Sequence, residues 1–319
     1  MDALELLRLN LTSPMVLGFA LGIVAALVKS DLRLPDAIHS ALGSYLLLAI
    51  GLKGGVELSK VALGEIALPL GATLLAGVSV PLVAFAILRR LGRFSAVDAA
   101  AVAAHYGSVS IVTFTAAATF VEARGIPSEG YLAALVALLE VPGILVALAL
   151  ARSARAGSAW HASLHEVLTG KSNLLLLGGL AIGALGGPSG FESVKPFFAD
   201  PFRGALTLFL VDMGLIAALR LRDLRQVGGF LVGFALLLPI VNGLAGAGLG
   251  TLAGLSPGGA TIFATMVASA SYIAAPVAVR ISLPEANPAL YLTSSLGLTF
   301  PFNLAVGIPL YHEVAQWFR

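Results

Sequence analysis

Two short stretches of small and hydroxyl-bearing residues interrupt long apolar runs of this chain. The first is Gly107-Ser108-Val109-Ser110, and the second is Ser269-Ala270-Ser271, with Pro276 close behind it. Glycine and serine are flexible or compete with helical hydrogen bonds, and proline removes a backbone donor. We therefore predict a helix that breaks near its middle at each stretch, with the two breaks forming one site.

The chemistry of such a site favours an anion. A helix that starts at a break exposes about four unpaired N–H groups, and its positive dipole end attracts negative charge. Serine adds neutral donors, and neither break contains Lys or Arg. For any single serine, packing or a bond to its own helix is an equally good interpretation. The predicted binding residues for a small, oxygen-rich monoanion are Tyr106, Gly107, Ser108, Val109, Ser110, Ser269, Ala270, Ser271 and Tyr272.

A cation site is predicted beside the anion site. Glu140 lies just before Pro142, which leaves a helix carbonyl without its donor. Ionisable residues inside a membrane span are functional candidates by default. We predict that Glu140, Asn303 and Thr113 supply oxygen ligands to a sodium ion. The alternative for Glu140 is a hydrogen bond to a neighbouring helix.

Three further polar residues lie in or at the ends of apolar runs. Lys53 either pairs with Asp212 or extends to the membrane interface. His105 precedes the first break, and we expect its ring to share a proton with a helix carbonyl rather than to titrate.

The elements that must position these residues are membrane helices. Of 319 residues, 58% are apolar and 11% are charged, whereas soluble domains carry about 25% charged residues. This excludes a soluble enzyme, a nucleic-acid binder and a disordered chain. Continuous apolar runs such as 231–240 exclude the alternating pattern of an outer-membrane barrel. The predicted spans are 14–29, 37–52, 65–90, 94–121, 130–151, 172–187, 201–219, 226–253, 258–282 and 289–315.

The loops between spans orient the chain. With ten spans, 12 of the 19 Lys and Arg residues lie on one side and 7 on the other. The positive-inside rule makes the first side cytoplasmic, so both termini are predicted outside. The cytoplasmic segment 152–171 is predicted to link two halves as a short interfacial helix. Its His161 and His165 are interpreted as solvated, and no metal site is predicted.

The two halves of the chain resemble each other. Tyr131-Leu132 and Tyr291-Leu292 each begin a span, and the serine-rich breaks match at nearly the same offset. Chance similarity of small-residue helices is the alternative. Five spans per half is an odd number, so the second half must insert in the opposite direction. We predict an all-α membrane protein of about ten transmembrane helices in two inverted five-helix repeats, 1–151 and 172–319, with spans four and nine broken. This is typical of secondary transporters.

With these motifs in place, the chain resembles the sodium-dependent bicarbonate permeases of the SbtA type. The matching stretches are 50–55, 106–110, 200–204, 268–276, 283–288 and 308–310. The resemblance implies a homotrimer in the inner membrane, with bicarbonate and co-transported sodium moved by a core that slides against a gate. It also implies a small PII-like regulator on the cytoplasmic face. Cyanobacterial members of the family have an Asp where this chain has Tyr272. If that Asp helps to bind sodium, either this chain is not coupled to sodium or Glu140 takes a larger share in binding it.

These observations predict a secondary active transporter that imports bicarbonate by sodium symport. The alternative is a permease or channel for another small monoanion, without sodium coupling. An enzyme is not predicted, because the chain has no His-Glu-x-x-His motif and no cysteine.

Overall fold

The computed structural model describes residues 3–153, 169–221 and 224–318. Within these ranges the chain is helical and contains no strand. The first half holds α1 (Ala3–Leu11), α2 (Pro14–Leu27), α3 (Asp36–Leu58), α4 (Leu63–Arg90), α5 (Ala96–Gly107), α6 (Ile111–Glu122) and α7 (Leu132–Ser153). Most of the predicted linker, residues 154–168, lies outside the described residues.

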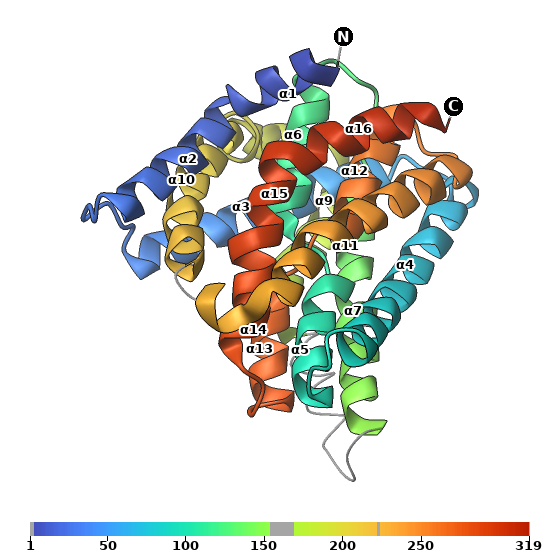
Figure 1. The fold of residues 1–319 in the computed structure, drawn as a ribbon. Coiled ribbons are helices and arrows are strands. Elements are labelled where there is room, and N and C mark those ends of the chain that lie inside the picture. Colours follow the sequence, from blue (N-terminus) through green and yellow to red (C-terminus); the bar gives the residue numbers. More distant parts are fainter. Residues whose placement is uncertain (1–2, 154–168, 222–223, 319) are drawn as a thin grey trace.

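The second half of the chain is described from α9 onward. It holds α9 (Lys171–Phe198), α10 (Phe202–Leu221), α11 (Leu224–Leu252), α12 (Pro257–Ala268), α13 (Ala274–Ser282) and α14 (Pro288–Leu292). The last span continues through a π-helical segment (Thr293–Thr299), α15 (Phe300–Phe302), a second π-helical segment (Asn303–Gly307) and α16 (Ile308–Trp317). Both termini lie at the same end of the molecule (Figure 1).

The described helices confirm an all-α membrane protein. Eight of them are long and apolar enough to cross a membrane: 36–58, 64–90, 96–122, 132–151, 171–198, 202–221, 227–252 and 288–317. Two shorter apolar helices, 14–27 and 257–268, lie where the first and ninth spans were predicted. The sixth span bends at Gly187, which has φ of 58° and lies where the sequence predicted its end.

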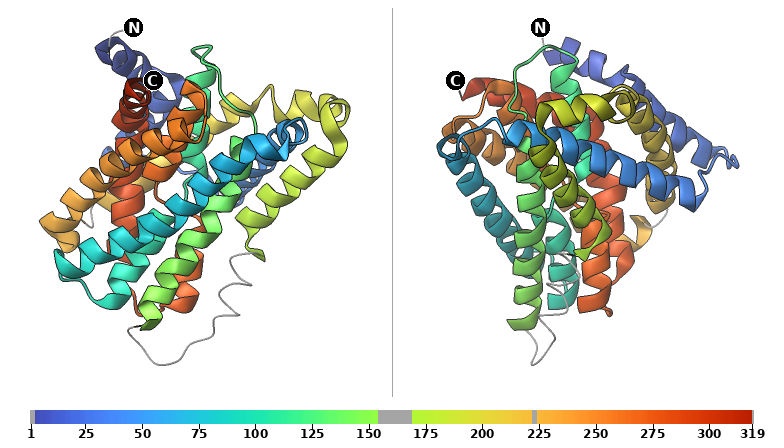
Figure 2. Two further views of the ribbon diagram at one scale, coloured as in Figure 1. Left: turned by 90° about the vertical axis from the view of Figure 1, so that its right-hand side faces the viewer. Right: turned by 180° about the vertical axis from the view of Figure 1, so that it is seen from behind.

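The helices form two groups by their packing. One group, here called the four-helix group, consists of α2, α3, α9 and α10, in which α2 packs on α10 and α3 packs on α9. The second, here called the crossing group, contains α4 to α7 and α11 to α16. Figure 1 shows α2 beside α10, and Figure 2 shows α3 beside α9 from behind.

Glycine lets the four-helix group pack backbone to backbone. A Cβ at Gly22 would overlap a carbonyl of α10, and one at Gly214 would overlap a carbonyl of α2. Gly55 and Gly183 make the same reciprocal contact between α3 and α9. Small residues spaced in this way favour close helix association in membranes, where lipid removes the hydrophobic driving force between helices.

The helix α1, which the sequence interpretation did not include, docks on the last span. Pro309 has no N–H, so the carbonyls one turn before it lose their helical donor. The side-chain amide of the buried Asn10 donates to two of them, Leu304 O at 2.9 Å and Ala305 O at 3.0 Å. The polar side chain of α1 therefore replaces the donor that proline removes.

Candidate functional site

Both predicted helix breaks are present. The first separates α5 from α6, with Ser108 extended at φ −103° and ψ 171°. The second separates α12 from α13, with Ser269 extended at φ −80° and ψ 168°. Each break follows a helix of 12 residues. The interruption of spans four and nine is thus confirmed.

Each broken helix is fixed at its start by a serine. Ser95 accepts from the backbone at the start of α5, and Ser256 does so at the start of α12. Glu129 also accepts from Ser256 N at 2.6 Å. Next to it, burial raises the pKa of the Tyr131 hydroxyl to about 12, with smaller contributions from Glu129 and Glu65. These contacts hold the broken helices in place before they reach the breaks.

The two breaks cross and bond to each other. Ser110 N donates to Ser269 Oγ at 2.9 Å, and Ser271 N donates to His105 O at 2.7 Å. Ser110 and Ser271 hold matching positions in their own breaks. These hydrogen bonds join residues more than 150 positions apart, so the two breaks lie together.

The four serines have different roles in this crossing. Ser269 donates to Met266 O at 2.8 Å and accepts from Ser110 N, so its hydroxyl is fully engaged. Ser110 and Ser271 only accept, from Thr113 and from Ala275 N. The hydroxyl of Ser108 has no partner among the described residues. The hydrogen bonds of Ser108, Ser110 and Ser271 described here use no serine proton, whereas Ser269 donates its own and clamps the two breaks together.

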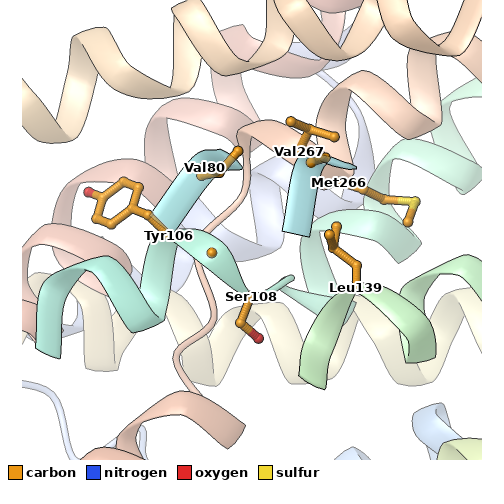
Figure 3. Close-up of a pocket in the computed structure, with 8 residues that line it drawn as sticks. Val80, Tyr106, Ser108, Leu139, Met266 and Val267 are labelled. Atoms are coloured by element: carbon orange, nitrogen blue, oxygen red, sulfur yellow. The ribbon is translucent and has the colours of Figure 1, made fainter. Parts of the chain in front are cut away.

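The predicted anion residues are enclosed. All nine are buried, and Tyr272 is the most exposed at 8%. Tyr106 bonds to Thr299 at 2.7 Å, while the Tyr272 hydroxyl has no described partner. Figure 3 shows the first break beside Leu139, Met266 and Val267, with the Ser108 hydroxyl pointing away from Met266 and Val267. The geometry is that of a closed site.

Two later spans contact the ends of the helices that precede the breaks. A Cβ at Gly143 of α7 would overlap the carbonyl of Gly107, at the end of α5. In the second half, the Asn303 side chain donates to Ala268 O at 3.0 Å, at the end of α12. Asn303 in turn accepts from Tyr311 at 2.7 Å. Each broken helix thus ends against the last span of its own half.

The predicted sodium ligands lie around the crossing but are not bonded to one another. Thr113 donates to Ser110 Oγ at 2.8 Å, and Asn303 is held by Ala268 and Tyr311. Glu140 is 1% exposed, and its Oε2 has no partner among the described residues. The predicted hydrogen bond from Glu140 to a neighbouring helix is not seen there. A buried carboxylate without a donor is costly, so this residue suits a cation.

Of the two alternatives for Lys53, pairing with Asp212 is excluded. Asp212 lies 2.6 Å from His39 Nδ1 and accepts from Leu34 N, so it does not pair with Lys53. Lys53 is 63% exposed and lies 3.7 Å from Glu122. The expectation for His105 is confirmed, since its Nδ1 lies 2.7 Å from Ala101 O.

The seam between the two helix groups carries charge at the end of α6. Glu122 of the crossing group lies near Lys53 of α3 and 3.3 Å from Arg203 of α10. Arg124 follows, donating to Phe120 O and stacking on the Phe120 ring, and burial lowers the pKa of its guanidinium. One carboxylate thus bridges both groups.

A small apolar hollow lies farther along the same seam. It is lined by residues of α3 and α10, by the first turn of α6, and by Ile273 of the second break. The start of α6 is where a break exposes backbone N–H groups. A ligand entering between the groups would meet the breaks here.

The hydroxyl-rich run of the last span was missed by the sequence interpretation. Thr299 accepts from Tyr106, because its own hydroxyl donates to Ala235 O at 2.7 Å. The run Thr293-Ser294-Ser295 precedes it and is fully buried. The same composition that marked the breaks could have identified this segment.

Comparison with protein-family models places most of the chain in a known family. A family model described as the Na⁺-dependent bicarbonate transporter superfamily matches residues 14–316. No curated protein matches the chain.

Proposed function

Because the chain belongs to the Na⁺-dependent bicarbonate transporter superfamily, we propose that it imports bicarbonate by sodium symport. The observation that carries this proposal is the crossing of two broken helices, with serine protons left unbonded in a buried site. A bicarbonate ion would be bound by these hydroxyls and by the helix starts, without a formal positive charge. One sodium with one bicarbonate is electroneutral, so the sodium gradient would drive uptake.

The same proposal includes two inverted repeats, 1–151 and 172–319, joined by the cytoplasmic linker 152–171. Ser95 and Ser256 cap the two broken helices, and α5 and α12 each contain 12 residues. The pairing of α2 with α10 matches that of α9 with α3 when the halves are exchanged. These equivalences support internal symmetry of the kind that secondary transporters use.

We further propose an elevator-type mechanism, in which the crossing group slides along the four-helix group. The crossing group holds all the proposed ligands, and the four-helix group packs through close glycine contacts. A homotrimer in the inner membrane, termini outside the cytoplasm and a PII-like regulator remain predictions from the resemblance and the loop charges.

Uptake by proteoliposomes tests the function. Purified protein should accumulate labelled bicarbonate with an inward sodium gradient, saturate with substrate, and stop when the gradient is removed. Uptake indifferent to sodium would contradict symport. Currents that do not saturate would favour the channel alternative.

Glu140→Gln should remove the response to sodium. The amide keeps the shape of the side chain but loses the charge that attracts the cation, while no described hydrogen bond of Oε2 is lost. Bicarbonate uptake should fall to the level seen without sodium, at unchanged melting temperature. Glu65→Gln, at an exposed position of α4, is the control. Sodium stimulation equal to that of the wild type would show that Glu140 is not a ligand.

Glu122→Gln should change the exchange between transporter states. The carboxylate bridges the two helix groups, but it is 57% exposed, and such pairs contribute about 0.2–1 kcal/mol. We expect up to about a fivefold shift in the conformational equilibrium, weaker at high salt. The chain has no cysteine, so spin labels on introduced cysteines can measure it. Glu192→Gln, which affects a pair within α9, should have no effect.

A further inference from the structure

His105 lies at the crossing through its backbone carbonyl, and its imidazole has no role in the mechanism described above. His105 is in the last turn of α5, is 0% exposed, and accepts the N–H of Ser271 through its carbonyl. Its ring stacks on Tyr291, with centroids 4.6 Å apart. The ring is therefore held in one orientation beside the proposed site.

The hydrogen bonds of the ring define its tautomer. Nδ1 lies 2.7 Å from Ala101 O, and a carbonyl only accepts, so Nδ1 carries the proton. No carboxylate pairs with this ring among the described residues, and a charged ring buried without one is costly. The ring is thus neutral, and Nε2 carries a lone pair.

That lone pair is unused. Nε2 is buried and has no hydrogen-bond partner within the described part of the chain. The hydroxyls of Ser108 and Tyr272 are also without partners, but a hydroxyl can rotate to donate or to accept. The neutral His105 ring offers only an acceptor at Nε2. A buried acceptor without a hydrogen bond lowers stability, and a ligand with an O–H or N–H donor would satisfy it.

Bicarbonate, the anion of the proposed function, carries such a donor. Bicarbonate has an O–H in addition to its acceptor oxygens, whereas formate and nitrate have only acceptors at neutral pH. A site made of donors alone would bind all three. Resting on the proposed function, we propose that His105 Nε2 accepts the O–H of the transported anion and so selects protonated oxyanions over aprotic ones.

Binding measurements on the full-length protein test this inference. Affinities for bicarbonate and formate are measured by calorimetry near pH 8 for the wild type and for His105→Phe. The Phe ring keeps the stacking on Tyr291 but lacks the acceptor. We expect bicarbonate affinity to fall about tenfold and formate affinity to change less than twofold, as for a single lost hydrogen bond. The ratio of the bicarbonate affinity to the formate affinity is measured on one protein sample, so partial unfolding does not change this ratio.

His312→Phe is the matched control. His312 is also buried, but both of its ring nitrogens have partners, Thr261 and Gln316. Its replacement should lower stability and leave the ratio unchanged. His105→Gln, which carries an acceptor oxygen, should restore part of the preference if the Phe variant fails to fold.

The outcomes separate the two proposals. A wild type without preference for bicarbonate over formate would overturn both this inference and the proposed substrate. A wild type that prefers bicarbonate, with a His105→Phe variant that keeps the preference or loses both affinities equally, would overturn this inference alone.

Discussion

Replacing Gly143 by alanine should abolish transport and lower the melting temperature. The new methyl group would overlap the carbonyl of Gly107, a backbone atom at the end of α5. Gly107 has little space to shift, because even a Cβ added to it would lie only 2.7 Å from the Pro81 ring. Overpacking of this kind costs about 1–3 kcal/mol even where side chains can adjust. Here the break itself must shift, and the proposed anion site shifts with it.

The measurement is labelled uptake in proteoliposomes together with thermal unfolding in detergent. Gly71→Ala is the matched control, since a Cβ at Gly71 of α4 meets nothing within 4 Å. That variant should keep wild-type uptake. A Gly143→Ala protein that transports normally would show that α7 does not hold the first break in place.

The double substitution Ser108→Ala and Ser271→Ala should remove most of the anion affinity. Each hydroxyl keeps its proton for a ligand, and a hydrogen bond to a charged group contributes about 1.5–3 kcal/mol. Two such losses weaken binding more than about 100-fold. Stability should change little, because the Ser108 hydroxyl has no described partner and Ser271 only accepts from Ala275 N.

Ser269→Ala separates binding from structure. Ser269 clamps the two breaks through Met266 O and Ser110 N, so its loss should lower the melting temperature. The affinity of the folded fraction should fall less than in the double variant. Calorimetric titration with bicarbonate measures the affinity of Ser269→Ala and of the double variant. Wild-type affinity in the double variant would move the anion site away from the crossing.

Much of the fold could be predicted from local patterns. Apolar runs, charged loops and serine-rich interruptions correspond closely to the helices observed, including the breaks at Ser108 and Ser269. Helix formation depends on neighbouring residues, so its signals are local. The helix α1 was missed because its docking depends on carbonyls that a distant proline leaves free.

The alternative in which Lys53 pairs with Asp212 fails for a geometric reason. The partner of Asp212, His39, is on the same helix as Lys53 but 14 residues earlier. At 1.5 Å per residue this is about 21 Å, so one carboxylate cannot reach both. The sequence shows which residues are charged, but it does not show which turns of α3 and α10 pack against each other.

By itself, the sequence determined a helical membrane protein with two broken spans whose interruptions are uncharged and rich in hydroxyl groups. Only the tertiary structure decided that Ser269 joins the two breaks while the other serine hydroxyls donate no described hydrogen bond. It also decided that the Nε2 atom of His105 has no described hydrogen-bond partner. Serines of the same type are indistinguishable in sequence. Their roles depend on hydrogen-bond partners up to 166 residues away, as for Ser271 and His105, which only the packing of the two halves brings together.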